Sequence, residues 1–428
     1  MTTTAAPAAF IGLDWADKKH DLCLRPGREA KAEFSTLEHT PQALAGWIAQ
    51  LRTRFEGAPV LICTEQTRGP LINFLIQHDF VQLCLPNPKS VARFREALRP
   101  SGAKDDPHDG EVLCELGRLH GEQFPRWLPN SAETRLIQAL TERRRKVVDD
   151  RTRLVLELQA TLKLAYPLAL ELFPERLEQP MVRAFLRKWP TFAELKKSRA
   201  QTVREFFYAH NSRSEDRIQE RLEKIAQAKP LTEDRPAVQS TRLATLDLVR
   251  RLEAIEESIQ EYDQAIAEAF AAHPDASVFE SLPGAGTVLA PRLLAAFGED
   301  RSRFTTAGQP QQYFGVAPIT VQSGKSRAVY FRRGCPKFLR QSIHEYAGLS
   351  VRYCAWARQY VESLKARGKT HHQAVRSLGF KWLRIIFRMW KDRVVYDEAK
   401  YLEALRRRGS PYAPQTESAS AKNPPLQK

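Results

Sequence analysis

Four acidic residues in the first third of the chain stand where carboxylates can gather around a cation. Asp14 ends one apolar run and Glu65 directly follows another. Asp106 and Asp109 lie three residues apart, where a helix is expected to begin. Carboxylates at the ends of neighbouring strands converge at one edge of a sheet, and residues at i and i+3 share a helix face. We therefore expect a single acidic cluster.

Such a cluster repels itself unless cations lie within it. Two Mg²⁺ ions held by carboxylates, with Mn²⁺ as the alternative metal, activate a nucleophile and stabilise the leaving oxygen in phosphodiester chemistry. Each acid also has an ordinary structural explanation: Asp14 as a turn residue, Glu65 as a surface carboxylate, and Asp106 and Asp109 as helix caps. Their joint placement after apolar runs favours the metal site.

The elements that must position these acids alternate between strand and helix patterns over residues 1–125. A strand hairpin and a third strand are followed by two helix and strand units and a further helix. The expected strands are 10–15, 21–24, 32–35, 59–64 and 81–85, and the expected helices are 41–55, 70–78 and 88–98. This order predicts an α/β domain with a mixed sheet covered by helices.

Two long helices are predicted over 131–170 and 240–272. In the second, apolar residues step by three and four, which is a heptad seam and indicates a coiled coil: Leu252, Ile255, Ile259, Tyr262, Ile266 and Ala269. The first offers a less regular seam at Leu136, Leu140, Val147, Leu154 and Leu158. An intramolecular antiparallel pair and a dimerisation stalk remain open, and no chemistry is assigned to 174–236. The connector spans 126–275.

The positive charge belongs to one region. The whole chain carries a formal charge of +16, and residues 301–393 contain 19 Lys and Arg against three acids. These residues lie within a C-terminal domain that is expected to span 276–400 and to be rich in α-helix. The domain is expected to bind a polyanion, because bases that neutralise phosphates release counterions. Two alternatives are that the basic face only aids solubility, or that it binds an anionic membrane surface. Residues 401–428 are expected to be a disordered tail.

Two short segments in the basic domain could contact nucleic acid. Ser323 and Ser326 flank Gly324 in a polar stretch near bases that could hold a phosphate and ease deprotonation of a hydroxyl: Lys325, Arg327, Arg332, Arg333, Lys337 and Arg340. The residues alone do not choose between the two serines. The turn at Gly284 and Gly286 opens into a helix, so its N–H groups could face a phosphate, although such turns are common.

Several motifs resemble one family. IGLDWA, CTEQTRG and SGAKDDPHDGEVL, followed by LPGAGTVLAPRLLAAFG, QQYFGVAPITVQSGKSR and RRGCPKFLRQ, are similar to the transposases typified by insertion sequence 110, called the DEDD transposases. The resemblance covers both ends and most of the chain. It implies a RuvC-like, RNase H-like domain with an acidic tetrad at Asp14, Glu65, Asp106 and Asp109, and a serine nucleophile at Ser323.

The resemblance also implies partners. Members act on double-stranded DNA, assemble as dimers and tetramers, combine the RuvC-like domain of one subunit with the serine domain of another, and are guided by a structured RNA from their own element. One departure concerns the tetrad: Asp105 stands where the family has Thr, so the choice of Asp106 as ligand rests on spacing. Gly110 replaces a helix-favouring Ala.

These observations predict a DNA recombinase, with two rivals kept open. A metal-dependent nuclease or junction resolvase would use water instead of serine, and a non-enzymatic nucleic-acid-binding protein would need no metal. The six cysteines show no paired spacing and are expected to be reduced packing residues. No signal peptide or long apolar run is evident, so a cytoplasmic, prokaryotic protein without a membrane partner is expected. His371 and His372 are expected to be exposed polar residues.

Overall fold

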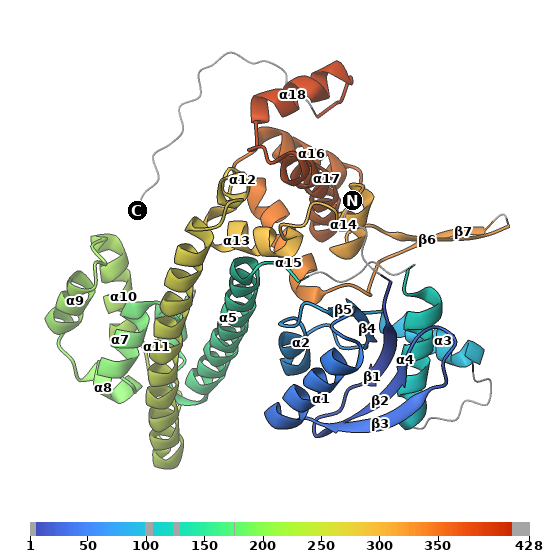
Figure 1. Cartoon of the computed structure of the whole chain (residues 1–428). Helices are drawn as coiled ribbons and strands as arrows, with labels where there is room; N and C mark the ends of the chain where they lie inside the picture. The colour runs from blue at the N-terminus through green and yellow to red at the C-terminus, as the bar shows by residue number, and fades with distance from the viewer. Residues whose placement is uncertain (1–5, 99–105, 123–128, 175, 325, 413–428) are drawn as a thin grey trace. The chain divides into compact units, whose positions relative to one another are not determined.

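The computed structural model describes residues 6–98, 106–122, 129–174, 176–324 and 326–412 of the chain, without the side chains of residues 106 and 107. Contacts divide the chain into two compact units, residues 1–129 and 130–428. Figure 1 shows both. Each is described by itself.

The first unit is built on a five-stranded mixed sheet with the strand order β3-β2-β1-β4-β5. The strands are β1 (Ala9–Asp14), β2 (Lys19–Arg25), β3 (Glu33–Glu38), β4 (Val60–Cys63) and β5 (Val81–Cys84). β2 runs antiparallel to β1 and β3, whereas β4 runs parallel to β1 and β5. The predicted mixed α/β architecture is thereby confirmed.

Helices cover both faces of this sheet (Figure 1). On one face, α1 (Pro41–Arg54) and α2 (Pro70–Leu75) pack on the odd-numbered β1 side chains, such as Ile11 and Leu13. On the other, α3 (Pro88–Leu98) and α4 (Asp106–His120) share a core with Phe10, Cys23 and Cys63. Because side chains alternate along a strand, the two cores divide the residues of each strand between them.

Helix α4 lies unusually close to β1. A Cβ atom placed on Gly12 would come within 1.9 Å of the Gly110 carbonyl oxygen and 2.3 Å of the Cys114 backbone nitrogen. On the helix side, a Cβ on Gly117 would lie 3.2 Å from the Cys63 Cβ. A Cβ on Gly110 would lie 3.3 Å from the Asp21 carbonyl oxygen, so the helix-weakening Gly110 also lets the helix backbone approach the sheet.

We expect Gly12→Ala to destabilise the first unit by about 3 kcal/mol or more, the upper range for overpacking, because the added methyl meets backbone atoms that cannot rotate away. Urea unfolding of the full chain, followed by circular dichroism, measures this. Gly46→Ala in α1 is the matched control, since a Cβ there meets nothing within 4 Å. Equal stability of the two variants would refute the close-approach argument.

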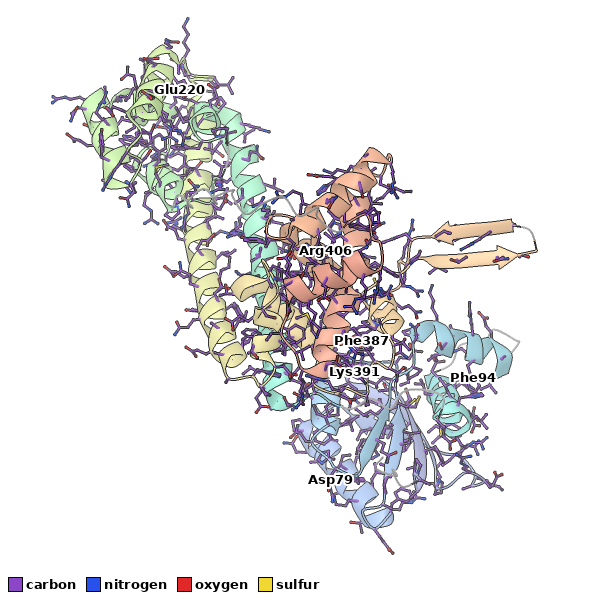
Figure 2. The ribbon with its side chains drawn as sticks, turned by 90° about the horizontal axis from the view of Figure 1, so that it is seen from above. Asp79, Phe94, Glu220, Phe387, Lys391 and Arg406 are labelled. Carbon is purple, nitrogen blue, oxygen red and sulfur yellow. The ribbon has the colours of Figure 1, made fainter. Side chains whose placement is uncertain are left out.

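The second unit contains two long helices, α5 (Ala132–Ala165) and α11 (Arg235–Ala271), packed side by side (Figures 1 and 2). Ion pairs join Arg144 to Asp263 at 2.5 Å and Arg151 to Glu256 at 3.0 Å. As the residue number rises along α5, that of its partner falls by the same amount, so the helices run antiparallel. Within this chain, the intramolecular pair is therefore the arrangement adopted.

The predicted seam is right for α11 and partly wrong for α5. Leu252, Ile259 and Ile266 are buried, as expected. On α5, however, Leu136 is 51% exposed. The buried residues in the N-terminal half of α5 are Thr134, Ile137 and Thr141. The cause is a polar contact: the Thr134 hydroxyl lies 2.8 Å from His273 Nε2 and donates to Glu299 Oε2 at 2.8 Å. This bonding turns the threonine edge of the helix inward.

The segment between the long helices folds into a small helical cluster with its own core. It comprises α6 (Leu168–Leu172), α7 (Pro180–Lys188), α8 (Phe192–Lys196), α9 (Ala200–Ala209) and α10 (Glu215–Gln227). Aromatic side chains fill its interior, with Phe185 and Phe207 fully buried. Residues 174–236, to which the sequence assigned no chemistry, thus include a packed subdomain.

The C-terminal part of the second unit packs helices around Trp356, Trp382 and Trp390, all fully buried. Its elements are α12 (Ala276–Glu280), α13 (Gly286–Phe297), α14 (Gly308–Tyr313), β6 (Ile319–Ser323), β7 (Ser326–Tyr330), α15 (Lys337–Ser350), α16 (Ala355–Ala366), α17 (His371–Asp392) and α18 (Glu398–Arg407). β6 and β7 form a two-stranded antiparallel sheet that the sequence analysis missed.

The expected start of a disordered tail at 401 is wrong, because α18 continues to Arg407 and buries Leu405; residues 413–428 lie outside the described part. All six cysteines are free, and five are buried. No helix among the described residues is long and apolar enough to span a membrane.

Candidate active site

Three carboxylate-bearing positions share one edge and one face of the first unit's sheet. Gly12 lies beside Cys63 in the parallel pair of β1 and β4. Asp14 follows Gly12 by two residues, and Glu65 follows Cys63 by two residues. Asp14, still within β1, follows the alternation of Gly12, which faces α4. Glu65, in the bend after β4, contacts Arg95 of α3 on the same side. Asp14 and Glu65 therefore lie at the same end of the sheet, as the sequence predicted.

Asp109 joins them from the first turns of α4. Its side chain is 9% exposed and lies 2.9 Å from Arg95 Nε, while Arg95 also reaches Glu65, with 3.8 Å between Nη2 and Oε1. The guanidinium of Arg95, from α3, thus stands between two of the predicted acids. Sequence reasoning missed Arg95, because its only local signal is a base in the last turn of a helix.

A second residue missed by the sequence analysis is Asp21. In the antiparallel register of β1 and β2, Asp21 lies directly opposite Asp14. Like charges directly opposite each other destabilise a sheet pair, so this edge favours a cation nearby. Asp21 was read only as part of a strand, because its partner becomes visible only when the hairpin register is known.

The chemistry of the side chains at this edge suits a divalent cation. The donors are all carboxylate oxygens, which suit Mg²⁺ and Mn²⁺, and the Arg95 guanidinium demonstrates that positive charge is accommodated between Glu65 and Asp109. Among the described side chains, no group of three or more His, Cys, Asp or Glu is close enough to hold a metal. The side chain of Asp106, at the start of α4, and all of Asp105 lie outside the described residues.

A buried histidine fixes the turn that follows Asp14. The Ala16 N–H donates to His20 Nδ1 at 3.2 Å, which leaves the His20 proton on Nε2, 2.9 Å from His39 Nδ1. His20 is fully buried. Burial, with His39 as a secondary cause, lowers the pKa of His20 from 6.5 to about 4. A neutral His20 therefore belongs to the folded turn beside the acidic edge.

This lowered pKa predicts acid sensitivity. Between pH 6.5 and about 4 the unfolded chain takes up a proton at His20 and the folded chain does not, so the free energy of unfolding falls as pH falls through that window. Thermal unfolding from pH 7 to pH 4 should show this loss, and His20→Gln should show a smaller one. An equal pH dependence of Tm in both proteins would contradict the assignment.

In the second unit, Ser323 is the last residue of β6 and pairs with Ser326, the first residue of β7. Gly324 between them has a φ of 55°, a left-handed value that favours glycine in a tight turn. Both serines are exposed. The two rival nucleophiles thus sit at the tip of one hairpin, and Lys325 lies outside the described residues.

The predicted phosphate-binding bases are distributed between the hairpin and its base. Arg327 and Arg333 are exposed, and Lys337 begins α15. Arg332 and Arg340 have structural contacts: Arg332 Nε donates to the Ala317 carbonyl at 3.2 Å, and Arg340 Nη1 donates to the Arg332 carbonyl at 3.4 Å. These two arginines therefore also hold the hairpin to the domain.

The turn containing Gly284 and Gly286 lies at a surface groove of about 1070 Å³ at the start of α13. Both glycines have positive φ, 78° and 55°. Across the groove lie Arg352 and a histidine pair, His344 and His372, with 3.3 Å between their ring nitrogens. His371 and His372 are exposed, as expected.

Comparison with known proteins supplies matches for both ends of the chain. Residues 11–167 match the DEDD transposase model of insertion sequence 110, described as a transposase, and residues 276–362 match the model of the IS116/IS110/IS902 transposase family. Together the two segments take in more than half of the chain.

Relatives extend over nearly the whole length. The IS117 mini-circle protein of Streptomyces coelicolor, named as a transposase, is 28% identical over 92% of this chain and 97% of its own. An IS900 protein of Mycobacterium paratuberculosis is 26% identical over 92% and 98%, and an IS116 protein of Streptomyces clavuligerus is 24% identical over 91% and 96%.

The mixed sheet with its acidic edge is consistent with the RNase H-like domain of a DEDD transposase. The chain belongs to the IS110-type transposase family. Its Ser323 hairpin falls within the second matched segment.

Proposed function

We propose that this transposase cleaves and exchanges DNA strands in a metal-dependent reaction whose nucleophile is Ser323. The observation that carries the proposal is the common sheet edge and face of Asp14 and Glu65, with Asp109 brought to them by α4 and Arg95. The exposed serine at the tip of a basic hairpin supplies the second half of the chemistry.

In this proposal Asp14, Glu65, Asp106 and Asp109 hold Mg²⁺ or Mn²⁺. When bound, the ions supply charge neutralisation at the scissile phosphate. Arg95, which pairs with Glu65 and Asp109 in this structure, would then be available to contact a phosphate oxygen. The glycine contact between β1 and α4 keeps Asp109 at the correct depth over the sheet.

Ser323 performs the covalent step. Its Oγ attacks phosphorus, so one Ser–O–P bond forms and one P–O bond to a deoxyribose breaks. The hydroxyl proton leaves to solvent and the departing deoxyribose oxygen gains one. Because the phosphoserine linkage retains a phosphodiester, reversal with a different deoxyribose hydroxyl rejoins strands without a further energy source.

Nucleic acid is held by the basic domain. The bases that contact phosphate lie in the Ser323 segment and just after it in the sequence: Lys325, Arg327, Arg332, Arg333, Lys337 and Arg340. The N–H groups at Gly284 and Gly286 contact a second phosphate. Following the family resemblance, a structured guide RNA selects the DNA, and a homodimer or tetramer joins the acidic edge of one subunit to the Ser323 hairpin of another. The α5 and α11 pair serves as a coiled-coil connector.

A nuclease that uses water is the second candidate, favoured by the spacing of the acids alone. The distinguishing experiment combines the protein, a duplex carrying the DNA that flanks its coding region, and RNA transcribed from that region. Denaturing gels should reveal a protein–DNA adduct that forms with Mg²⁺ and not with a chelator. Free cleaved ends without an adduct would favour the nuclease, and no metal-dependent product would favour a binding protein without activity.

A further inference from the structure

The β6–β7 hairpin is an arm that projects from the C-terminal helices in both views (Figures 1 and 2). Its strands pair only with each other among the described residues. The side chains along it are almost all exposed. A two-stranded hairpin of this kind is marginally stable in water by itself, so the arm is a candidate for a bound partner.

The two faces of the arm differ in chemistry. Residues paired across the strands share a face, so Ile319 with Tyr330 and Val321 with Ala328 lie on the same side as Ser323 with Ser326. The opposite face carries Thr320 with Val329 and Gln322 with Arg327. The proposed nucleophile therefore ends an apolar face, whereas the opposite face combines Val329 with three polar or charged side chains.

The apolar face is uncovered. Val321 is 52% exposed and Tyr330 is 57% exposed. The base of the arm, by contrast, is fixed: the Phe331 ring lies 5.1 Å from the guanidinium carbon of Arg340 and 4.4 Å from that of Arg376. An arm with a fixed base and an exposed apolar face is typical of a preorganised binding element.

Charge identifies the partner. Residues 301–344 contain eight Lys and Arg and no Asp or Glu, so the arm and the segments that flank it in the sequence carry only positive formal charge. A protein surface of mixed charge has no need of this excess, whereas a nucleic-acid groove offers phosphates at its rims and apolar sugar faces between them. Two-stranded ribbons fit such grooves.

We propose that the arm lies in a groove of duplex DNA, with Ile319, Val321 and Tyr330 against sugars and bases and Arg327 reaching the phosphates. This inference rests on the proposed function and adds how the substrate is held. Docking of the apolar face carries Ser323, which lies on the same face at the tip, down to the sugar–phosphate backbone.

The test is the affinity of the full chain for duplex DNA, measured by fluorescence anisotropy at several salt concentrations. Val321→Thr/Tyr330→Thr should weaken binding about tenfold with an unchanged salt slope, because no charge is lost. Val329→Thr, on the opposite face, is the matched control and should bind within twofold of wild type. Arg327→Ala should reduce the salt slope by about one.

Wild-type affinity of the double variant for duplex DNA would overturn the proposal. So would a change in sedimentation without a change in DNA affinity, which would assign the face to a second copy of the chain. A loss of affinity for RNA alone would also overturn it. The adduct assay separates the docking proposal from the proposed serine chemistry. If wild type forms no adduct while Val321→Thr/Tyr330→Thr still loses DNA affinity, the proposed chemistry fails and the docking stands.

Discussion

Ser323→Ala should abolish the protein–DNA adduct while leaving DNA binding within about twofold of wild type. Removing the hydroxyl deletes the only atom proposed to bond to phosphorus, and loss of a nucleophilic serine in another enzyme costs on the order of 10⁶ in rate. The side chain is exposed at the hairpin tip, so the change removes no packing. Gel quantification of adduct per bound DNA measures the effect.

Ser326→Ala is the matched control, since Ser326 pairs with Ser323 on the same face of the same hairpin. It should retain adduct formation at a rate within about tenfold of wild type. If Ser326→Ala abolishes the adduct and Ser323→Ala does not, the two serines exchange roles. If both variants cleave at the wild-type rate, water is the nucleophile.

Asp109→Asn should reduce cleavage by well over 100-fold. Mutation of a residue that only supports a metal ligand already lowers metal affinity or activity by about 10–100-fold, and Asp109 is proposed to be a ligand itself. Asparagine keeps the size of the side chain and removes the charge that the ion requires. Binding of Mn²⁺, followed by electron paramagnetic resonance, should weaken in parallel with activity.

Asp79→Asn is the control for this change. Asp79 also pairs with an arginine in the first unit, at 2.6 Å from Arg52, but its side chain is 83% exposed. It precedes β5, whereas Glu65 follows the parallel strand β4, so the two lie at opposite edges of the sheet; Figure 2 labels Asp79. We expect normal cleavage and Mn²⁺ binding. A comparable loss in both variants would mean that the effect reflects general destabilisation.

Sequence patterns predicted the first unit well, because the central strands β1 and β4 bury side chains on both faces of the sheet and read as apolar runs. A buried strand is the clearest explanation for the apolar run that ends at Asp14 and for the one that precedes Glu65. Patterns failed where side chains contact residues distant in sequence. Arg95 and Asp21 became site residues only through helix packing and strand register.

The failures in the second unit have related causes. The β6–β7 arm has no buried face, so its residues lack the alternation that marks a strand. Leu136 fits a heptad by spacing, yet polar bonding of Thr134 rotates the helix away from it. Gly110 looked unfavourable for a helix until the packing of α4 on the sheet gave it a role, since a Cβ there would lie 3.3 Å from the Asp21 carbonyl oxygen. The roles of Ser323 and the tetrad remain predictions.

The most direct test of the account is the location of Mn²⁺ in crystals of the protein soaked with that ion, found from its anomalous scattering. We predict a peak at the acidic edge, roughly 2 Å from carboxylate oxygens of Asp14, Glu65 or Asp109, with Arg95 displaced from between them. An edge that still holds Arg95 and has no peak, at Mn²⁺ concentrations that support cleavage, would contradict the metal-dependent mechanism.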